Sequence, residues 1–235
     1  MNSTPFKKIL ILVTILAVPG FLYYLLQEKG KNRYRPLSVF GPKTVASTFH
    51  HVRGERIPDT IYHTLQDFNL TNQFNTPVSL KNLEGKIILF GLFRAGAGDS
   101  RPDHMSRVMQ KYAAMYAQND LLHFIGITVN PSEEPPALLK QYAERLSASK
   151  GKWDLLTGDS ATVYNLIRKG LFLDALPAAG NEPKTFTYSN LLVLTDSHHR
   201  IRGYYEVVND EALSKLDDEI KVLIVEELRN KNDGR

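Results

Sequence analysis

The sequence predicts an α/β fold in which a mixed β-sheet is flanked by helices. Short apolar runs alternate with longer segments whose apolar residues recur at the helical period. Two pairs of strand-like segments, one near the start of this pattern and one near its end, are joined by polar turn residues, which is typical of hairpins. With 235 residues, 43% of them apolar, the chain is long enough for one domain with a sizeable core and an appendage.

The composition excludes several classes of function. The net charge is only +4, and 29 basic and 25 acidic residues are spread along the chain. A nucleic-acid-binding protein would carry a basic stripe interleaved with aromatic residues, and the sequence has none, so no nucleic-acid partner is expected. There is no cysteine, which excludes disulfides, thiol catalysis and zinc–thiolate sites. The chain is therefore not expected to be a thiol enzyme, and no cofactor is expected.

A single membrane-spanning helix is predicted near the N-terminus. Residues 9–26 carry no charge, and at about 1.5 Å per residue a helix there covers roughly 27 Å, close to the apolar thickness of a bilayer. A cleaved signal peptide is less favoured because the residues after Gly20 are bulky. The prediction is a tail at 1–8 and an uncleaved anchor at 9–26. Basic residues just after the span, taken alone, favour a cytoplasmic position for the rest of the chain.

The remainder divides into a tether and a folded domain. Residues 27–60 are largely polar and contain Pro36, Pro42 and Pro58, so they are predicted to be a tether. The domain is expected to cover residues 61–235.

The domain is predicted to begin with a hairpin. Apolar and polar residues alternate around Phe68 and Leu70, and again around Val78 and Leu80. The turn-forming residues 71–77 separate the two segments, which favours a hairpin at a sheet edge.

Three buried strands and three helices are expected next. The apolar run at 86–93 predicts a strand, and the helix after it is expected to be capped by Asp99 or Ser100. Further strands are predicted at 122–129 and 153–156. The apolar residues with helical spacing are Met105, Val108, Met109, Tyr112 and Tyr116; Leu138, Leu139, Tyr142 and Leu146; and Val163, Leu166 and Ile167.

A second hairpin and a final helix complete the pattern. Residues 190–195 and 201–205 flank the polar turn 196–200, which predicts two antiparallel strands. A parallel βαβ start followed by an antiparallel hairpin and a helix is the thioredoxin-like arrangement, here with an N-terminal hairpin extension. The last helix is expected to bury Leu213, Leu216, Ile220, Leu223 and Leu228.

Six segments between residues 37 and 228 carry a more specific resemblance. They are 39–42 (VFGP), 68–73 (FNLTNQ), 79–86 (SLKNLEGK), 127–131 (ITVNP), 153–158 (WDLLTG) and 201–205 (IRGYY). In this order they make the chain similar to the SCO/SenC family. These are membrane-tethered thioredoxin-fold proteins that assemble the copper centre of cytochrome c oxidase.

The resemblance implies a copper site whose ligands are replaced. Family members bind copper through Cys-Pro-x-x-Cys-Pro after the first central strand and through a distant histidine. Aligned by resemblance, the two cysteines fall on Ala97 and Arg101, and the histidine falls on Tyr188. An alanine methyl group has no lone pair, arginine is a permanent cation, and soft thiolates are what select copper(I). Neither copper binding nor thiol redox chemistry is expected at this position.

The implied role is a non-catalytic binding or scaffold factor related to oxidase assembly, with a protein partner in that process. The resemblance also implies a single-pass protein of the bacterial cytoplasmic membrane whose C-terminal domain is periplasmic. This orientation conflicts with the basic residues that follow the predicted span.

Two alternatives remain open. Arg94 and Arg101, with Tyr188 and Asp99 nearby, could form a pocket for an anionic ligand or peptide. The second alternative is a copper carrier with displaced ligands that include His104, although a solvated helix residue is the ordinary reading of that side chain.

Other polar residues have ordinary interpretations. His63 and His123 have no obvious partner, and the adjacent His198 and His199 are expected to diverge in a hairpin turn. The acidic pair at 133–134 is expected to be a solvated turn.

Overall fold

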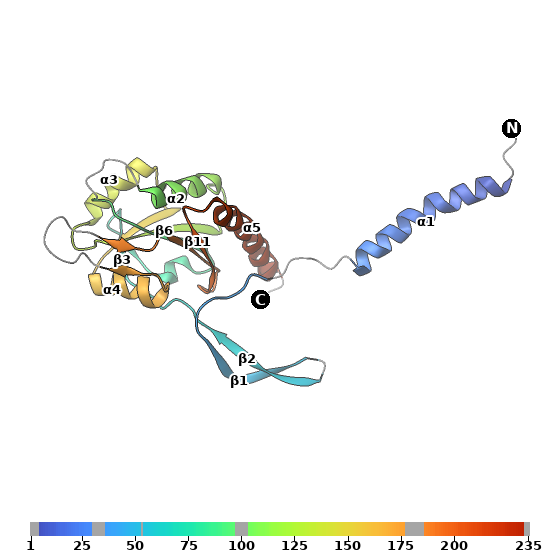
Figure 1. Ribbon diagram of the computed structural model, residues 1–235, viewed down its shortest axis with the longest axis horizontal. Coiled ribbons are helices and arrows are strands. Elements are labelled where there is room, and N and C mark those ends of the chain that lie inside the picture. The colour runs from blue at the N-terminus through green and yellow to red at the C-terminus, as the bar shows by residue number, and fades with distance from the viewer. Residues whose placement is uncertain (1–4, 30–35, 53, 97–102, 177–185, 233–235) are drawn as a thin grey trace. The chain divides into compact units, whose positions relative to one another are not determined.

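The computed structural model describes residues 5–29, 36–52, 54–96, 103–176 and 186–232 (Figure 1). The chain forms two compact units, Met1–Arg35 and Pro36–Arg235. Helix α1 (Pro5–Lys29) makes up the described part of the first unit. Within the described residues, no helix is both long enough and apolar enough to cross a membrane. The span predicted at 9–26 lies within a helix, but its role as a membrane anchor is not confirmed.

The second unit is built on a seven-stranded mixed sheet with the order β11–β10–β5–β6–β7–β3–β4. Strands β5, β6 and β7 are parallel, and the remaining neighbours pair antiparallel. This arrangement confirms the predicted α/β class, both hairpins and the three central strands. The strand bounds are β3 (Leu70–Asn72), β4 (Pro77–Val78), β5 (Ile87–Phe93), β6 (Leu122–Thr128), β7 (Trp153–Thr157), β10 (Leu191–Thr195) and β11 (Ile201–Glu206).

Helices cover both faces of the sheet, as Figure 1 shows for α2 and α3 on one side and α4 on the other. Alternate residues of β5 serve the two cores, because successive side chains in a strand point to opposite faces. Leu89 and Phe93 pack in the core under α2, α3 and α5, whereas Phe90 and Leu92 pack in the core with α4 and η2. The helix bounds are η1 (Leu80–Leu83), α2 (His104–Met115), α3 (Pro136–Leu146), α4 (Ser160–Asn165), η2 (Leu166–Gly170, a π-helical turn) and α5 (Asp210–Asn232).

Two local predictions about the helices are wrong. Helix α2 begins at His104, and its cap is Asp103, whose carboxylate accepts the Ser106 N–H at 2.7 Å. The predicted caps Asp99 and Ser100 lie outside the described residues. Leu228, predicted to be buried, has 48% of its surface exposed, because the last turns of α5 continue past the core.

The segment predicted to be a tether contains an antiparallel hairpin, β1 (Lys43–Val52) and β2 (Glu55–Tyr62). A second short pair, β8 (Ala175–Leu176) and β9 (Thr187–Tyr188), was also not expected.

The chain before the β1–β2 hairpin packs on the domain through a buried arginine. Arg202 donates to the backbone carbonyl of Leu37 at 2.8 Å and to the carboxylates of Asp196 and Glu226, at 3.0 Å in each case. The Phe40 N–H also donates to the carbonyl of Ile201 at 2.8 Å. These contacts fix residues 37–40 to strand β11.

Candidate functional site

The candidate site lies beyond the carboxyl end of β5, where a helix follows a buried parallel strand. Among the predicted site residues, Arg94 directly follows β5, His104 opens α2, and Tyr188 ends β9. Ala97, Asp99 and Arg101 lie outside the described residues. The described part of the site therefore comprises the residues at the end of β5 and at the start of α2, together with the side chains that contact them.

Tyr188 is joined to the first turn of α2. Its hydroxyl donates to the Oδ2 atom of Asp103 at 3.5 Å, and Asp103 is the N-cap of the helix. Burial and, after it, the negative charge of Asp103 raise the pKa of Tyr188 above its ordinary value of 10.0. The phenol is therefore held neutral at physiological pH, and a neutral phenol is a poor metal ligand.

Tyr142 fixes the same turn from the side of α3. Its hydroxyl donates to Ser106 Oγ at 3.0 Å and accepts the backbone N–H of Asp103 at 3.3 Å. Its ring stacks on Phe93 at the end of β5, with centroids 5.3 Å apart and planes 9° from parallel. A buried aromatic ring with a satisfied hydroxyl thus couples β5, α2 and α3.

Glu134 holds the chain where it leaves β5. Only 1% of its surface is exposed, which contradicts the solvated position expected for it, whereas its neighbour Glu133 is exposed as expected. The Glu134 carboxylate accepts the Gly96 N–H at 2.7 Å and the Thr128 hydroxyl. Acidic residues are rarely buried without partners, so these two donors explain why the side chain points inward. Sequence reasoning missed this residue because its partners lie 38 and 6 positions away.

Arg94 follows β5, and its guanidinium packs on an aromatic ring. Its guanidinium lies over the Phe186 ring, 4.4 Å from the centroid, in a cation–π contact. Its Nε atom is buried and has no hydrogen-bond partner among the described residues. A half-buried guanidinium with an unused donor is a feature of sites that accept anionic groups.

The His104 side chain is exposed in the first turn of α2, as expected for a solvated helix residue, and it also contacts the backbone. Its Nε2 atom lies 2.9 Å from the carbonyl oxygen of Val207, so one ring nitrogen is engaged by the backbone. His63 and His123, for which the sequence indicated no obvious partner, each have a hydrogen-bonding partner in the structure. His63 Nε2 lies 3.0 Å from the Gly170 carbonyl, and His123 Nε2 lies 2.9 Å from Asp154 Oδ2 in the core.

The residues that the structure describes include one group with metal-ligating atoms within 4.8 Å of one another: Asp196, His198 and Glu227. Its carboxylates are already used. Asp196 accepts from Arg200 Nε at 2.8 Å and from a buried arginine, Arg202, at 3.0 Å, and Glu227 accepts the Ser197 hydroxyl at 2.6 Å. Two adjacent guanidinium groups repel a cation, so this group is a structural ion-pair network.

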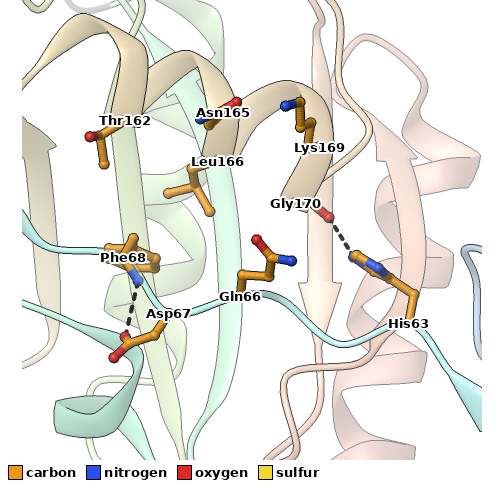
Figure 2. Close-up of a pocket in the computed structure, with 9 residues that line it drawn as sticks. All are labelled: His63, Gln66, Asp67, Phe68, Thr162, Asn165, Leu166, Lys169 and Gly170. Atoms are coloured by element: carbon orange, nitrogen blue, oxygen red, sulfur yellow. Dashed lines mark hydrogen bonds between the residues drawn. The ribbon is translucent and has the colours of Figure 1, made fainter.

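A separate cavity of about 270 Å³ lies between the segment 63–68 and the α4–η2 stretch (Figure 2). His63 forms one wall through its contact with the Gly170 carbonyl, which Figure 2 marks. Asp67 is occupied by the backbone N–H groups of Phe68 and Leu80. The lining of the cavity combines apolar side chains with one acidic residue, Asp67, and one basic residue, Lys169. The lining residues are His63, Gln66, Asp67, Phe68, Thr162, Asn165, Leu166, Lys169 and Gly170.

Comparison with solved structures supports the fold. A SCO1/SenC family lipoprotein from Bacillus anthracis str. Ames superposes with a TM-score of 0.61 at 20% identity, covering 68% of this chain and 95% of that protein. BsSco, described as a member of the Sco family of cytochrome c oxidase assembly proteins with a disulfide switch, gives a TM-score of 0.58 at 20% identity, covering 71% and 96%. At such identities the likeness concerns the fold.

Sequence comparison identifies the family. The SCO1 protein homolog of Bacillus subtilis (strain 168) is 27% identical over 107 residues, which cover 46% of this chain. The match spans about half, 55%, of the length of that relative. The SCO1/SenC family model matches residues 59–221, which include β5, α2 and Tyr188. The chain therefore belongs to the SCO1/SenC family, as a divergent member without cysteine.

Proposed function

We propose that this protein is a non-redox member of its family, which acts by binding a protein partner in cytochrome c oxidase assembly and does not carry copper at the family site. The observation that carries the proposal is the absence of cysteine from the whole sequence. Without a thiolate the chain has neither the soft ligand that selects copper(I) nor a group for thiol–disulfide exchange.

The described residue at the family's copper position, Tyr188, is also a poor copper ligand. The proposal assigns Tyr188 to the family's histidine position, and its hydroxyl already donates to Asp103. Burial and that carboxylate raise the pKa of the phenol, so no phenolate is available at neutral pH. The side chains that support the segment between β5 and α2 are nevertheless present. The stacked rings of Tyr142 and Phe93 and the buried carboxylate of Glu134 still hold the ends of the connection between β5 and α2.

Deleting the gene and measuring cytochrome c oxidase activity in membranes tests the proposed role. We expect the activity to fall and to be restored by the unaltered, cysteine-free chain, because the role requires no redox chemistry. Oxidase activity that is unchanged by the deletion would contradict a role in assembly. Restoration only by a chain in which cysteines replace Ala97 and Arg101 would contradict the non-redox reading.

We further propose that α1 tethers the domain to a membrane, with the domain on the periplasmic side of a bacterial cytoplasmic membrane. The support is the uncharged segment 9–26 together with family membership. A topology reporter fused after Arg235 tests the orientation. Activity of a cytoplasmic reporter there would contradict it, and would favour the basic residues after the segment as the determinant of topology.

A second candidate function is the binding of a small anionic ligand next to Arg94. It is favoured by the buried Nε atom of Arg94, which lacks a hydrogen-bond partner among the described residues. Citrate and inorganic phosphate, tested as probes by thermal shift, should stabilise the unaltered chain but not an Arg94→Gln variant. Arg107→Gln, which changes an exposed arginine of α2, is the matched control. An equal response of all three proteins would rule out a site at Arg94.

A further inference from the structure

The β1–β2 hairpin forms a sheet of its own. Figure 1 shows it extending away from the seven-stranded sheet, and neither strand pairs with any other described strand. All of its described side chains are exposed or partly exposed, so both faces are open. An isolated two-stranded hairpin is marginally stable in water. Its exposed apolar side chains are Val45, Phe49, Val52, Ile57 and Ile61.

The register separates the hairpin's charges between its two faces. Directly opposed residues share a face, and positions two apart along a strand share a face. One face, here called the cation–aromatic face, consists of four cross-strand pairs: Lys43 with Tyr62, Val45 with Thr60, Phe49 with Pro58, and His51 with Arg56. It carries no carboxylate. Both acidic residues of the hairpin, Glu55 and Asp59, belong to the opposite face, where Asp59 Oδ1 lies 2.6 Å from His50 Nδ1.

The cations of this face lie on aromatic rings. The Arg56 guanidinium is 3.3 Å from the centroid of the Phe49 ring, and Lys43 Nζ is 5.4 Å from that of Tyr62. Cation–π contacts hold the side chains flat on the sheet while leaving the positive charges available to a second group. Positions 56 and 62 of β2 are about 20 Å apart at the rise of a strand. The face therefore offers two separated positive sites with an apolar surface between them.

Several occupants of this face are disfavoured. A β-bulge interrupts β1 between Val45 and Phe49, and Pro58 removes a backbone donor from β2, so both edges are poorly suited to adding another strand. A two-fold pairing with a second copy would bring like charges together. Anionic membranes are recognised by clusters of about four to eight lysines and arginines, whereas this face has Lys43 and Arg56.

We propose that the cation–aromatic face binds an acidic segment of a partner protein, with carboxylates placed to meet Lys43 and Arg56 and an apolar side chain between them. Charge complementarity at such a rim governs partner choice and association rate. The surface consists of residues of β1 and β2, so the proposal stands whether or not the site after β5 holds a metal.

The test uses the full-length chain in neutral detergent and a phage-displayed library of random short peptides. Selected peptides are synthesised and titrated by fluorescence anisotropy against three proteins. These are the unaltered chain, the double variant Lys43→Glu/Arg56→Glu, and a control double variant, Lys81→Glu/Lys140→Glu. The control makes the same change in net charge at exposed lysines outside the hairpin. Because all four residues are exposed, the thermal unfolding midpoints should agree.

We expect the selected peptides to be acidic, to bind the hairpin variant at least about tenfold more weakly, and to bind the control like the unaltered chain. Hydrogen exchange of amides in residues 43–62 should slow when such a peptide is added. Selection of peptides without acidic residues, or equal binding to all three proteins, would overturn the proposal. Protection of these amides by phosphatidylglycerol nanodiscs and not by the peptides would also overturn it, in favour of a lipid surface.

Discussion

The hydroxyl of Tyr188 lies 3.5 Å from Asp103 Oδ2, and the same carboxylate caps helix α2. One acidic side chain therefore sets both the start of the helix and the protonation state of the residue that we assign to the family's histidine position. Burial of Tyr188 contributes most to its raised pKa, and Asp103 adds to it.

Replacing Asp103 with alanine should have two separable effects. Loss of the cap should lower the free energy of unfolding by about 1 kcal/mol. The pKa of Tyr188 should fall toward its ordinary value, because a negative neighbour is removed. Asp159→Ala is the matched control, since Asp159 caps α4 through the Thr162 N–H and, within the described part of the chain, bonds to no tyrosine. Denaturant unfolding, with tyrosine titration in the presence and absence of a Tyr188→Phe change, measures both effects. An unchanged Tyr188 titration in Asp103→Ala would contradict the coupling.

Removing the carboxylate of Glu134 should loosen the chain after β5. In Glu134→Ala the Gly96 N–H and the Thr128 hydroxyl lose their acceptor, which should cost about 2 kcal/mol of unfolding free energy. Glu144→Ala, at an exposed position of α3, should change stability by less than about 0.5 kcal/mol. Urea unfolding gives the energies, and hydrogen exchange at Gly96 should accelerate in the first variant only. A Gly96 amide that exchanges as slowly as before would show that Glu134 does not hold this segment.

The free energy of unfolding should decrease as the pH falls below neutrality, partly because of His199. Burial lowers the pKa of His199 below its ordinary value of 6.5, so the unfolded chain binds a proton that the folded chain resists. This contribution is present above pH 6.5 and is lost as the pH falls through the lower, folded-state value. His199 has a positive φ of 60°, which asparagine tolerates, so His199→Asn should not strain the backbone. This variant should reduce the slope of unfolding free energy against pH in the acid range. His198→Asn serves as the control. Equal slopes in the two variants, measured by unfolding between pH 5 and 7, would contradict the assignment.

The buried Arg202 should matter more than its neighbour Arg200, although both bond to Asp196. Arg202→Leu leaves the fully buried Asp196 short of a partner and frees the Leu37 carbonyl, which should cost about 3 kcal/mol or more. Arg200→Leu, at a partly exposed side chain, should cost about 1 kcal/mol or less. Chemical unfolding compares the two variants. Similar losses would show that burial does not determine the strength of this network.

The parts of the fold that could be predicted are those in which pattern and environment agree. The apolar run in β5 and the helical period in α2 follow from burial of one or both faces. The β1–β2 hairpin could not be predicted, because neither of its faces is buried and its residues alternate without a consistent apolar side. Pro58 also suggested a tether, although an edge strand accommodates it.

The candidate site was predictable only through the family resemblance. Sequence spacing indicates nothing about the contact of Glu134 with Gly96 or of Tyr188 with Asp103, because each joins segments far apart in the chain. The prediction that His63 and His123 lack obvious partners was wrong for the same reason, since one partner is a backbone carbonyl and the other a carboxylate on the next strand.

A copper(I) competition titration of the full-length chain against a chromophoric chelator tests the central claim most directly. We expect the unaltered protein to take no full equivalent of copper from the chelator. The variant Ala97→Cys/Arg101→Cys/Tyr188→His should do so, because it regains the family's soft ligands. A full equivalent of copper held tightly by the unaltered chain would contradict the account.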